Sequence, residues 1–400
     1  MTTDSNSAGA GASLMLYPSQ EAYLKRLGDR PYLYAGMGTG KTRMALALAV
    51  RGGYRKVLVV TPPSVRDTKQ WEAEVRAVGL EDWFDEFIVV GTTWLQKWRE
   101  HRLELFKDFA VIIDEAHRIK KPQSLQGRGA YELCRVVRRY WLLSGTPMQN
   151  WSEAANYAKI TGFVRNKTAF YRRYIVQAPA YAHKGMDIVG YKHTDELARW
   201  WSNIATRLKT EECVELPSKI VKRVSIPVLR AAYLKLIKTR MTPDGEPLDS
   251  APKLNWALRA EAETAGKKLQ WAVEKIEGLE NCLVFVNTKK AVKELGKRLK
   301  RAGIKYGVWT GSKKQRFENY DVMIVQYQAG GTGLNLQKFN STIFLSPCYS
   351  YSDFTQAMAR TWRGGQTRRC MFYCLEASNT IDERIYEVLI QKHDFDQNTL

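Results

Sequence analysis

Short apolar runs bounded by polar segments recur in two sets along the chain. The first set lies at residues 32–35, 57–61, 87–90, 110–114 and 140–144. The second set lies at residues 282–286, 306–310, 322–326, 342–346 and 370–375. Because segments with helical spacing separate these β-rich runs, the pattern predicts parallel strands joined by crossover helices. We therefore expect an α/β fold with two lobes.

The region between the two sets, residues 151–280, has few such runs and is rich in aromatic and Arg residues, which predicts helices. Within it, residues 241–252 concentrate Pro, Gly and acidic residues, as loops do. The expected segments are a flexible tail at 1–13, a first lobe at 14–160, a helical protrusion at 161–217, a linker with helices of the second lobe at 218–280, a second lobe at 281–390 and a C-terminal tail at 391–400.

The net charge of the chain indicates what kind of partner it binds. The chain of 400 residues has 62 Lys and Arg against 41 Asp and Glu, a net charge of +21. The halves 1–200 and 201–400 contribute +10 and +11. A surplus present in both halves favours a polyanion that lies across both lobes, nucleic acid before a membrane. No apolar run approaches the length of roughly 18 residues that a membrane helix needs, and the first residues lack the pattern of a signal peptide.

The sequence A-G-M-G-T-G-K-T at 35–42 follows an apolar run and precedes a helical one. In this context the backbone N–H groups of a Gly-rich loop bind phosphate oxygens, Lys41 reaches the β- and γ-phosphates and the Thr42 hydroxyl binds Mg²⁺. The first position of such a loop is usually Gly and is Ala35 here. The residues expected to hold the nucleotide are Gly36, Gly38, Thr39, Gly40, Lys41 and Thr42.

The sequence A-V-I-I-D-E-A-H at 110–117 completes a site for nucleoside triphosphate hydrolysis. An apolar strand that ends in Asp-Glu places Asp114 at the carboxyl edge of the sheet, beside the phosphate loop. There Asp114 can hold Mg²⁺ through water, together with Thr42, and Glu115 can orient and deprotonate the attacking water. Lys41, Asp114 and Glu115 are therefore expected to be catalytic.

Four segments resemble motifs II, III, V and VI of the Swi/Snf-like ATPases, the double-stranded DNA translocase branch of helicase superfamily two. These segments are D-E-A-H-R-I-K-K at 114–121, L-L-S-G-T-P-M-Q-N at 142–150, Q-A-G-G-T-G-L-N-L at 328–336 and Q-A-M-A-R-T-W-R-G-G-Q at 356–366. The resemblance covers roughly residues 14–390. It implies two RecA-like lobes with parallel sheets, helical insertions between them, and ATP with Mg²⁺ as the nucleotide and metal.

The resemblance also implies roles for individual residues. Pro18 and Gln20 are expected to recognise the adenine, and Arg360 and Arg363 to act on the γ-phosphate as further catalytic residues. The residues expected to couple phosphate state to nucleic acid are His117, Ser144 and Thr146. Those expected to contact nucleic acid are Thr61, Pro62, Thr93 and Thr332, with Gly333 on the nucleotide. The family usually has an acidic residue and a His where this chain has Ala359 and Trp362.

By resemblance, then, the chain is expected to be an ATP-dependent translocase or remodeller on duplex DNA. Two alternatives stay open: a strand-separating superfamily-two helicase on DNA or RNA, and a nucleic-acid-binding scaffold whose ATP site is a switch. We expect double-stranded DNA as the main partner, an additional protein partner, no membrane and a monomer. So short a chain favours a phage or bacterial source and a cytoplasmic location, or a nuclear one in a eukaryote.

Overall fold

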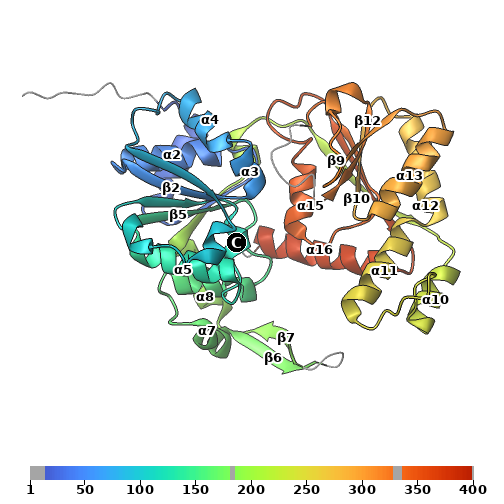
Figure 1. Cartoon of the computed structure of the whole chain (residues 1–400), viewed down its shortest axis with the longest axis horizontal. Helices are drawn as coiled ribbons and strands as arrows, with labels where there is room; N and C mark the ends of the chain where they lie inside the picture. Colours follow the sequence, from blue (N-terminus) through green and yellow to red (C-terminus); the bar gives the residue numbers. More distant parts are fainter. Residues whose placement is uncertain (1–13, 181–184, 328–335, 399–400) are drawn as a thin grey trace, which may run out of the picture. The chain divides into compact units, whose positions relative to one another are not determined.

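A computed structural model describes residues 14–180, 185–327 and 336–398. The tail predicted at 1–13 lies outside these residues, and so do Thr332, predicted to contact nucleic acid, and Gly333, predicted to contact the nucleotide. The chain divides into two compact units, with unit 1 running to Cys213 and unit 2 from Val214 to Gln397. Each unit is built around one sheet, as the two sets of apolar runs predict (Figure 1).

The sheet of unit 1 has six parallel strands in the order β3-β2-β4-β5-β1-β8. The strands are β1 (Tyr32–Ala35), β2 (Lys56–Thr61), β3 (Glu86–Gly91), β4 (Ala110–Ile113), β5 (Arg139–Ser144) and β8 (Ala205–Leu208). The first five confirm the predicted strands. The sixth, β8, was not predicted because it is four residues long and follows a helix in a region whose composition favours helices.

Helices on one face of this sheet enclose the main core of unit 1. Strand residues such as Leu33, Val59 and Ile112 pack there against Met44 and Trp71, all essentially buried. The helices of unit 1 are α1 (Pro18–Leu27), α2 (Lys41–Arg51), α3 (Pro63–Asp67), α4 (Gln70–Ala77), α5 (Leu125–Val136), α6 (Ala155–Ile160), α7 (Lys167–Tyr174), α8 (Thr194–Ile204) and α9 (Thr210–Cys213). Helix α2 starts directly after the Gly-rich loop, so the loop lies between a buried strand and a helix N-terminus.

The region predicted as a helical protrusion contains α7 and α8 but also strands. Besides β8, it holds the antiparallel pair β6 (Ile175–Pro179) and β7 (Met186–Tyr191), which extends from α7 (Figure 1). The indole of Trp201 on α8 packs against Tyr32, with ring centroids 5.0 Å apart, so the Trp pair of α8 belongs to the core. The protrusion is therefore mixed rather than helical.

The sheet of unit 2 also has six parallel strands, in the order β11-β12-β10-β13-β14-β9. The strands are β9 (Lys219–Ile226), β10 (Cys282–Val286), β11 (Tyr306–Trp309), β12 (Val322–Gln326), β13 (Ser341–Phe344) and β14 (Cys370–Ala377). Strand β9, with the sequence K-I-V-K-R-V-S-I, was not predicted because its charges interrupt the apolar run. Such charges are expected on an edge strand, and β9 is one.

Helices cover both faces of the second sheet. Helices α12 and α13 pack on one face around Val284 and Ile324, and α15 and α16 pack on the other around Phe285 and Phe344 (Figure 1). The helices of unit 2 are α10 (Ala231–Thr239), α11 (Ala251–Glu263), α12 (Gly266–Glu277), α13 (Lys289–Arg301), α15 (Tyr351–Met358) and α16 (Ile381–Asn398). Helix α16 includes most of the segment predicted as a C-terminal tail. Within the described ranges, no helix is both long and apolar enough to cross a bilayer.

Candidate nucleotide site

The Gly-rich loop lies between β1 and α2, at the carboxyl edge of the first sheet. Gly38 and Gly40 have φ angles of 75° and 78°, a backbone region that strongly favours glycine. A Cβ atom at Gly36 would overlap the hydroxyl of Thr210, which itself donates to the carbonyl of Met37 at 3.0 Å. Thr210 opens α9, just after the unpredicted strand β8, so sequence reasoning missed this support of the loop.

Gln20 fastens the loop to α1. Its side chain is 3% exposed, its Nε2 donates to the Thr39 carbonyl at 2.8 Å and its Oε1 accepts from the backbone N–H of Tyr17 at 2.9 Å. The amide oxygen and the amide nitrogen of Gln20 are therefore both bonded to backbone groups of this chain. Pro18, predicted to recognise adenine with Gln20, is the exposed first residue of α1.

Lys41 is held back onto the loop. Its Nζ donates to the carbonyl oxygens of Ala35 at 3.1 Å and Gly36 at 3.0 Å. Thr42 follows it in the first turn of α2. The two residues thus lie at the end of the loop and the start of α2, and their roles as a phosphate-binding lysine and a metal-binding hydroxyl stay predictions.

Asp114 follows β4 directly and lies at the same edge of the sheet. Its Oδ2 accepts from the Thr61 hydroxyl and its Oδ1 from the backbone N–H of Glu115, both at 2.9 Å. Burial and the neighbouring Glu115 carboxylate raise the pKa of Asp114 above its usual range. The Asp114 carboxylate and the Thr42 hydroxyl are hard oxygen donors of the kind that Mg²⁺ prefers. Thr61, predicted to contact nucleic acid, is fully buried and orients this carboxylate instead.

Glu115 starts a chain of polar contacts that leads to the next strand. Its backbone has φ 50°, the left-handed region, which turns the chain sharply into the 3₁₀ turn at Ala116–Ile119. His117 Nδ1 lies 3.2 Å from Glu115 Oε2 and 3.3 Å from the Ser144 hydroxyl, which accepts from the Thr146 N–H at 3.1 Å. Burial opposes ionisation of Glu115, but the hydrogen bond and charge of His117 outweigh it and lower its pKa. The structure thus brings together all three predicted coupling residues.

Tyr157 on α6 is a second link between these segments that sequence reasoning missed. Its side chain is fully buried, and its hydroxyl lies 3.0 Å from the carbonyl oxygen of Ala116 and 2.9 Å from that of Pro147. The hydroxyl of Tyr32 lies 3.5 Å away. Tyr157 therefore joins the turn after β4 to the turn after β5. No motif marks it, because one tyrosine in an aromatic-rich segment carries no spacing signal.

The other residues predicted to contact nucleic acid differ in exposure. Pro62 is buried and caps α3, whereas Thr93 is exposed and precedes the 3₁₀ helix Trp94–Lys97. Both follow strands of the first sheet at its carboxyl edge, β2 and β3. Of Pro62 and Thr93, therefore, Thr93 is the one whose side chain solvent or nucleic acid can reach.

Arg360 and Arg363 lie in unit 2, in turns that follow α15. The sequence favours one helical turn for the pair, but α15 ends at Met358 and Gly364 and Gly365 come next. Burial lowers the pKa of Arg363 below its usual value. The nearby Gln366 is 6% exposed and its Nε2 lies within hydrogen-bonding distance of the carbonyl oxygens of Gln337, Phe339 and Thr361 at 3.0, 3.1 and 3.3 Å. Gln366 therefore fixes the turn that carries the arginines.

Trp362, which stands where the family usually has His, is also part of this turn. Its indole Nε1 donates to the Pro217 carbonyl at 2.8 Å, and the Lys219 ammonium lies 3.5 Å from the centre of its ring. Trp362 thereby fastens the arginine turn to the start of β9.

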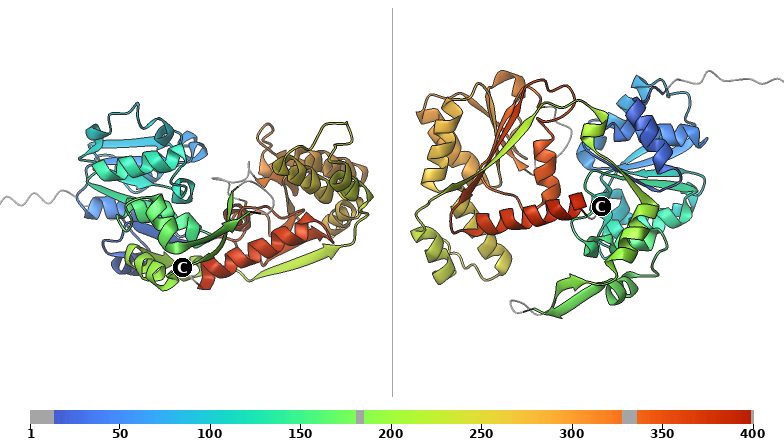
Figure 2. Two further views of the ribbon diagram at one scale, coloured as in Figure 1. Left: turned by 90° about the horizontal axis from the view of Figure 1, so that it is seen from below. Right: turned by 180° about the vertical axis from the view of Figure 1, so that it is seen from behind.

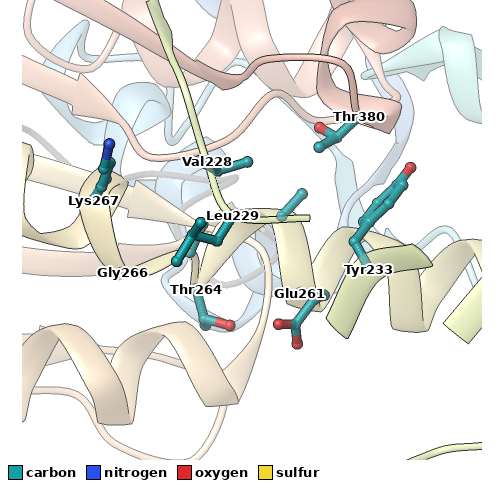
Figure 3. Close-up of a pocket in the computed structure, with 10 residues that line it drawn as sticks. Val228, Leu229, Tyr233, Glu261, Thr264, Gly266, Lys267 and Thr380 are labelled. Carbon is teal, nitrogen blue, oxygen red and sulfur yellow. The ribbon is translucent and has the colours of Figure 1, made fainter. Parts of the chain in front are cut away.

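A separate cavity of about 150 Å³ lies in unit 2, between the α10–α11 pair and the start of α12 (Figure 3). Its lining includes Tyr233, Glu261, Lys267 and Thr380, and none of the predicted site residues. Among the described residues, no group of three or more His, Cys, Asp or Glu side chains could hold a metal ion.

Comparison with protein families matches two segments of the chain. Residues 85–172 match the SNF2-related domain, and residues 267–365 match the helicase conserved C-terminal domain. The chain therefore contains an SNF2-related domain and a helicase C-terminal domain, each matched over part of its length. The first match includes the Asp114–Thr146 network, and the second includes both arginines.

Proteins similar to this chain come from eukaryotes and bacteria. A SWI/SNF-related matrix-associated actin-dependent regulator of chromatin subfamily A-like protein 1 from Xenopus tropicalis is 26% identical over 89% of the chain and 41% of the relative. A putative ATP-dependent helicase/translocase YwqA from Bacillus subtilis is 24% identical over 92% of the chain and 46% of the relative. The chain thus spans less than half the length of these relatives.

A shorter similarity and a solved structure complete the comparison. A human DNA repair and recombination protein RAD54-like is 39% identical over 66 residues, 16% of this chain and 9% of the relative. The Sulfolobus solfataricus SWI2/SNF2 ATPase core, solved in complex with dsDNA, is 20% identical, with coverage of 96% of this chain and 94% of that one and a TM-score of 0.42.

Proposed function

We propose that this SNF2-related chain is a nucleic-acid-stimulated ATPase that uses ATP hydrolysis to move along duplex DNA. The observation that carries the proposal is the contact chain from Glu115 through His117 and Ser144 to Thr146. It connects the carboxylate expected to activate water with a turn after the next strand of the sheet. A change at the phosphate can therefore alter the conformation of that turn.

The hydrolysis step uses residues of unit 1. Backbone N–H groups of the loop at 36–40 bind the phosphates, and Lys41 leaves the carbonyls of Ala35 and Gly36 to pair with phosphate oxygens. Glu115 accepts the proton of the attacking water, and His117 orients that carboxylate. Mg²⁺, held by Thr42 and Asp114, would neutralise charge on the β- and γ-phosphates. We propose that Arg360 and Arg363 act on the γ-phosphate, and this role is supported by the resemblance of residues 356–366 to motif VI of the family.

Steady-state ATPase rates test this function. The chain alone, with single-stranded DNA, with duplex DNA and with duplex RNA should show strong stimulation by duplex DNA. Stimulation by single strands or RNA but not by duplex DNA would overturn the proposal in favour of a strand-separating helicase. A negligible rate under all four conditions would favour a nucleic-acid-binding scaffold with an ATP switch.

Movement along DNA requires a second measurement, because stimulation of the ATPase rate shows that DNA binds and activates hydrolysis but does not show translocation. A third strand paired in the major groove of a duplex is displaced by an enzyme that moves along it. We expect displacement that needs ATP and that Glu115→Gln abolishes. Rapid duplex-stimulated hydrolysis with no displacement would argue against translocation while leaving the ATPase assignment in place.

A further inference from the structure

The ribbon formed by β6 and β7 is the least covered sheet in the described chain. It has two strands and no third strand beside it, and it extends from α7 in each view of Figure 2. Three apolar residues on β7 face solvent: Met186 is 52% exposed, Ile188 39% and Val189 61%. An isolated ribbon with apolar residues in water is marginally stable and calls for a partner.

The base of the ribbon is well anchored. Tyr174, at the end of α7, is 1% exposed and stacks on Phe163 with ring centroids 5.9 Å apart. Its hydroxyl donates to Glu196 at 3.0 Å, and its carbonyl accepts from the backbone N–H of Lys192 at 2.8 Å. The contacts of Tyr174 thus hold the start of the ribbon firmly on the rest of unit 1.

Charge identifies the partner class. The described residues of 165–193 carry five Lys or Arg and one Asp. Arg172 and Lys192 are exposed at the base of the ribbon, and no ion pair links either of them to a carboxylate in the described chain. A surface with this excess of positive charge attracts a polyanion and repels a positively charged partner.

We propose that the β6–β7 ribbon binds nucleic acid where a duplex is opened, with its apolar residues against bases. Phosphates offer no partner to Met186, Ile188 or Val189, whereas the faces of unstacked bases do. Met186 and Ile188, two positions apart on β7, share one face of the ribbon, and Val189 lies at the β-bulge opposite Val176 and Gln177, so these apolar residues can lie against an unpaired base. Arg172 and Lys192 bind the adjoining phosphates. This proposal rests on the proposed function and adds an opened junction to its substrate.

Binding and ATPase rates on a plain duplex and on a fork with unpaired arms test the ribbon. The apolar variant carries Met186→Ser, Ile188→Ser and Val189→Ser, and Leu105→Ser, at a residue 70% exposed elsewhere in unit 1, is its control. We expect the apolar variant to bind the fork about tenfold more weakly with little change on the duplex, a loss of about 1.4 kcal/mol. The control should bind both as the wild type does.

A second variant tests the charges. Arg172→Glu with Lys192→Glu should lower the salt dependence of fork binding, the slope of log K against log salt, by about 1 for each residue. Arg76→Glu, at an exposed site on α4, is the matched control. Fork binding and fork-stimulated rates that equal the wild type in both variants would overturn the ribbon proposal. A wild-type chain that duplex DNA does not stimulate would instead overturn the proposed function, and fork binding would still decide the ribbon.

Discussion

A buried ion pair at the centre of unit 2 gives a sharp test of the fold. The Lys268 ammonium and the Asp382 carboxylate are in contact, and the two side chains are 0% and 1% exposed. Lys268 also donates to the Ser346 hydroxyl at 2.5 Å and to the Ala262 carbonyl at 3.3 Å. Asp382 accepts from the N–H of Ala377 at 3.1 Å. The pair thus joins α12 to α16 and to the ends of β13 and β14.

Lys268→Met removes the ammonium and leaves Asp382 as a buried charge without its partner. A change of this kind costs about 3–5 kcal/mol. In a unit of this size each kcal/mol lowers Tm by about 2–4 °C, so we expect a fall of roughly 6–20 °C. The control is Lys297→Met on α13, whose pair with Glu294 is 50% and 36% exposed. An exposed pair of that kind contributes only about 0–1 kcal/mol.

The double variant Lys268→Met with Asp382→Asn isolates the interaction. The asparagine keeps an oxygen for the Ala377 N–H but carries no charge, so the double variant should be more stable than Lys268→Met alone. Urea unfolding gives the free energies, and hydrogen exchange of peptides from α12 and the start of α16 locates the effect. A loss below about 1 kcal/mol for Lys268→Met, or additive losses in the two single variants, would refute the reasoning.

Three further outcomes follow from unit 1. Glu115→Gln should still bind ATP, measured with a fluorescent analogue, while its turnover falls roughly 10²–10⁴-fold because the general base is lost; near-normal turnover would contradict that role. Ser144→Ala leaves His117 and the Thr146 N–H without their shared partner, so stimulation by DNA should fall more than the basal rate, and an equal fall in both would argue against coupling. Tyr157→Phe should cost about 1–3 kcal/mol in urea unfolding, because it removes the single hydroxyl proton within reach of the buried Ala116 and Pro147 carbonyls; an unchanged midpoint would contradict a stabilising role for this hydroxyl.

Most strands that the sequence predicts, such as β2 and β10, are buried on both faces and therefore form continuous apolar runs. Strands β8 and β9 escaped prediction because each mixes charged with apolar residues, whereas the other two edge strands, β3 and β11, keep apolar runs. The ribbon escaped for a related reason, since β7 packs against no core and shows no periodic apolar face. Periodicity reports burial, and strands that avoid burial do not produce it.

The site shows the same division between local and long-range information. The positions of Lys41 and Asp114 at the carboxyl edge of the first sheet could be predicted from the strand and loop pattern around each, and His117 was placed through the resemblance to the Swi/Snf-like motif. Thr61 and Gln20 were placed in the correct region, but the structure uses both to hold other site residues. Thr210, which supports the loop from a distant segment, carries no local signal. The residues hardest to predict are thus those that position others, because a hydroxyl acting across 173 residues of sequence, as that of Thr210 does, leaves no pattern around itself.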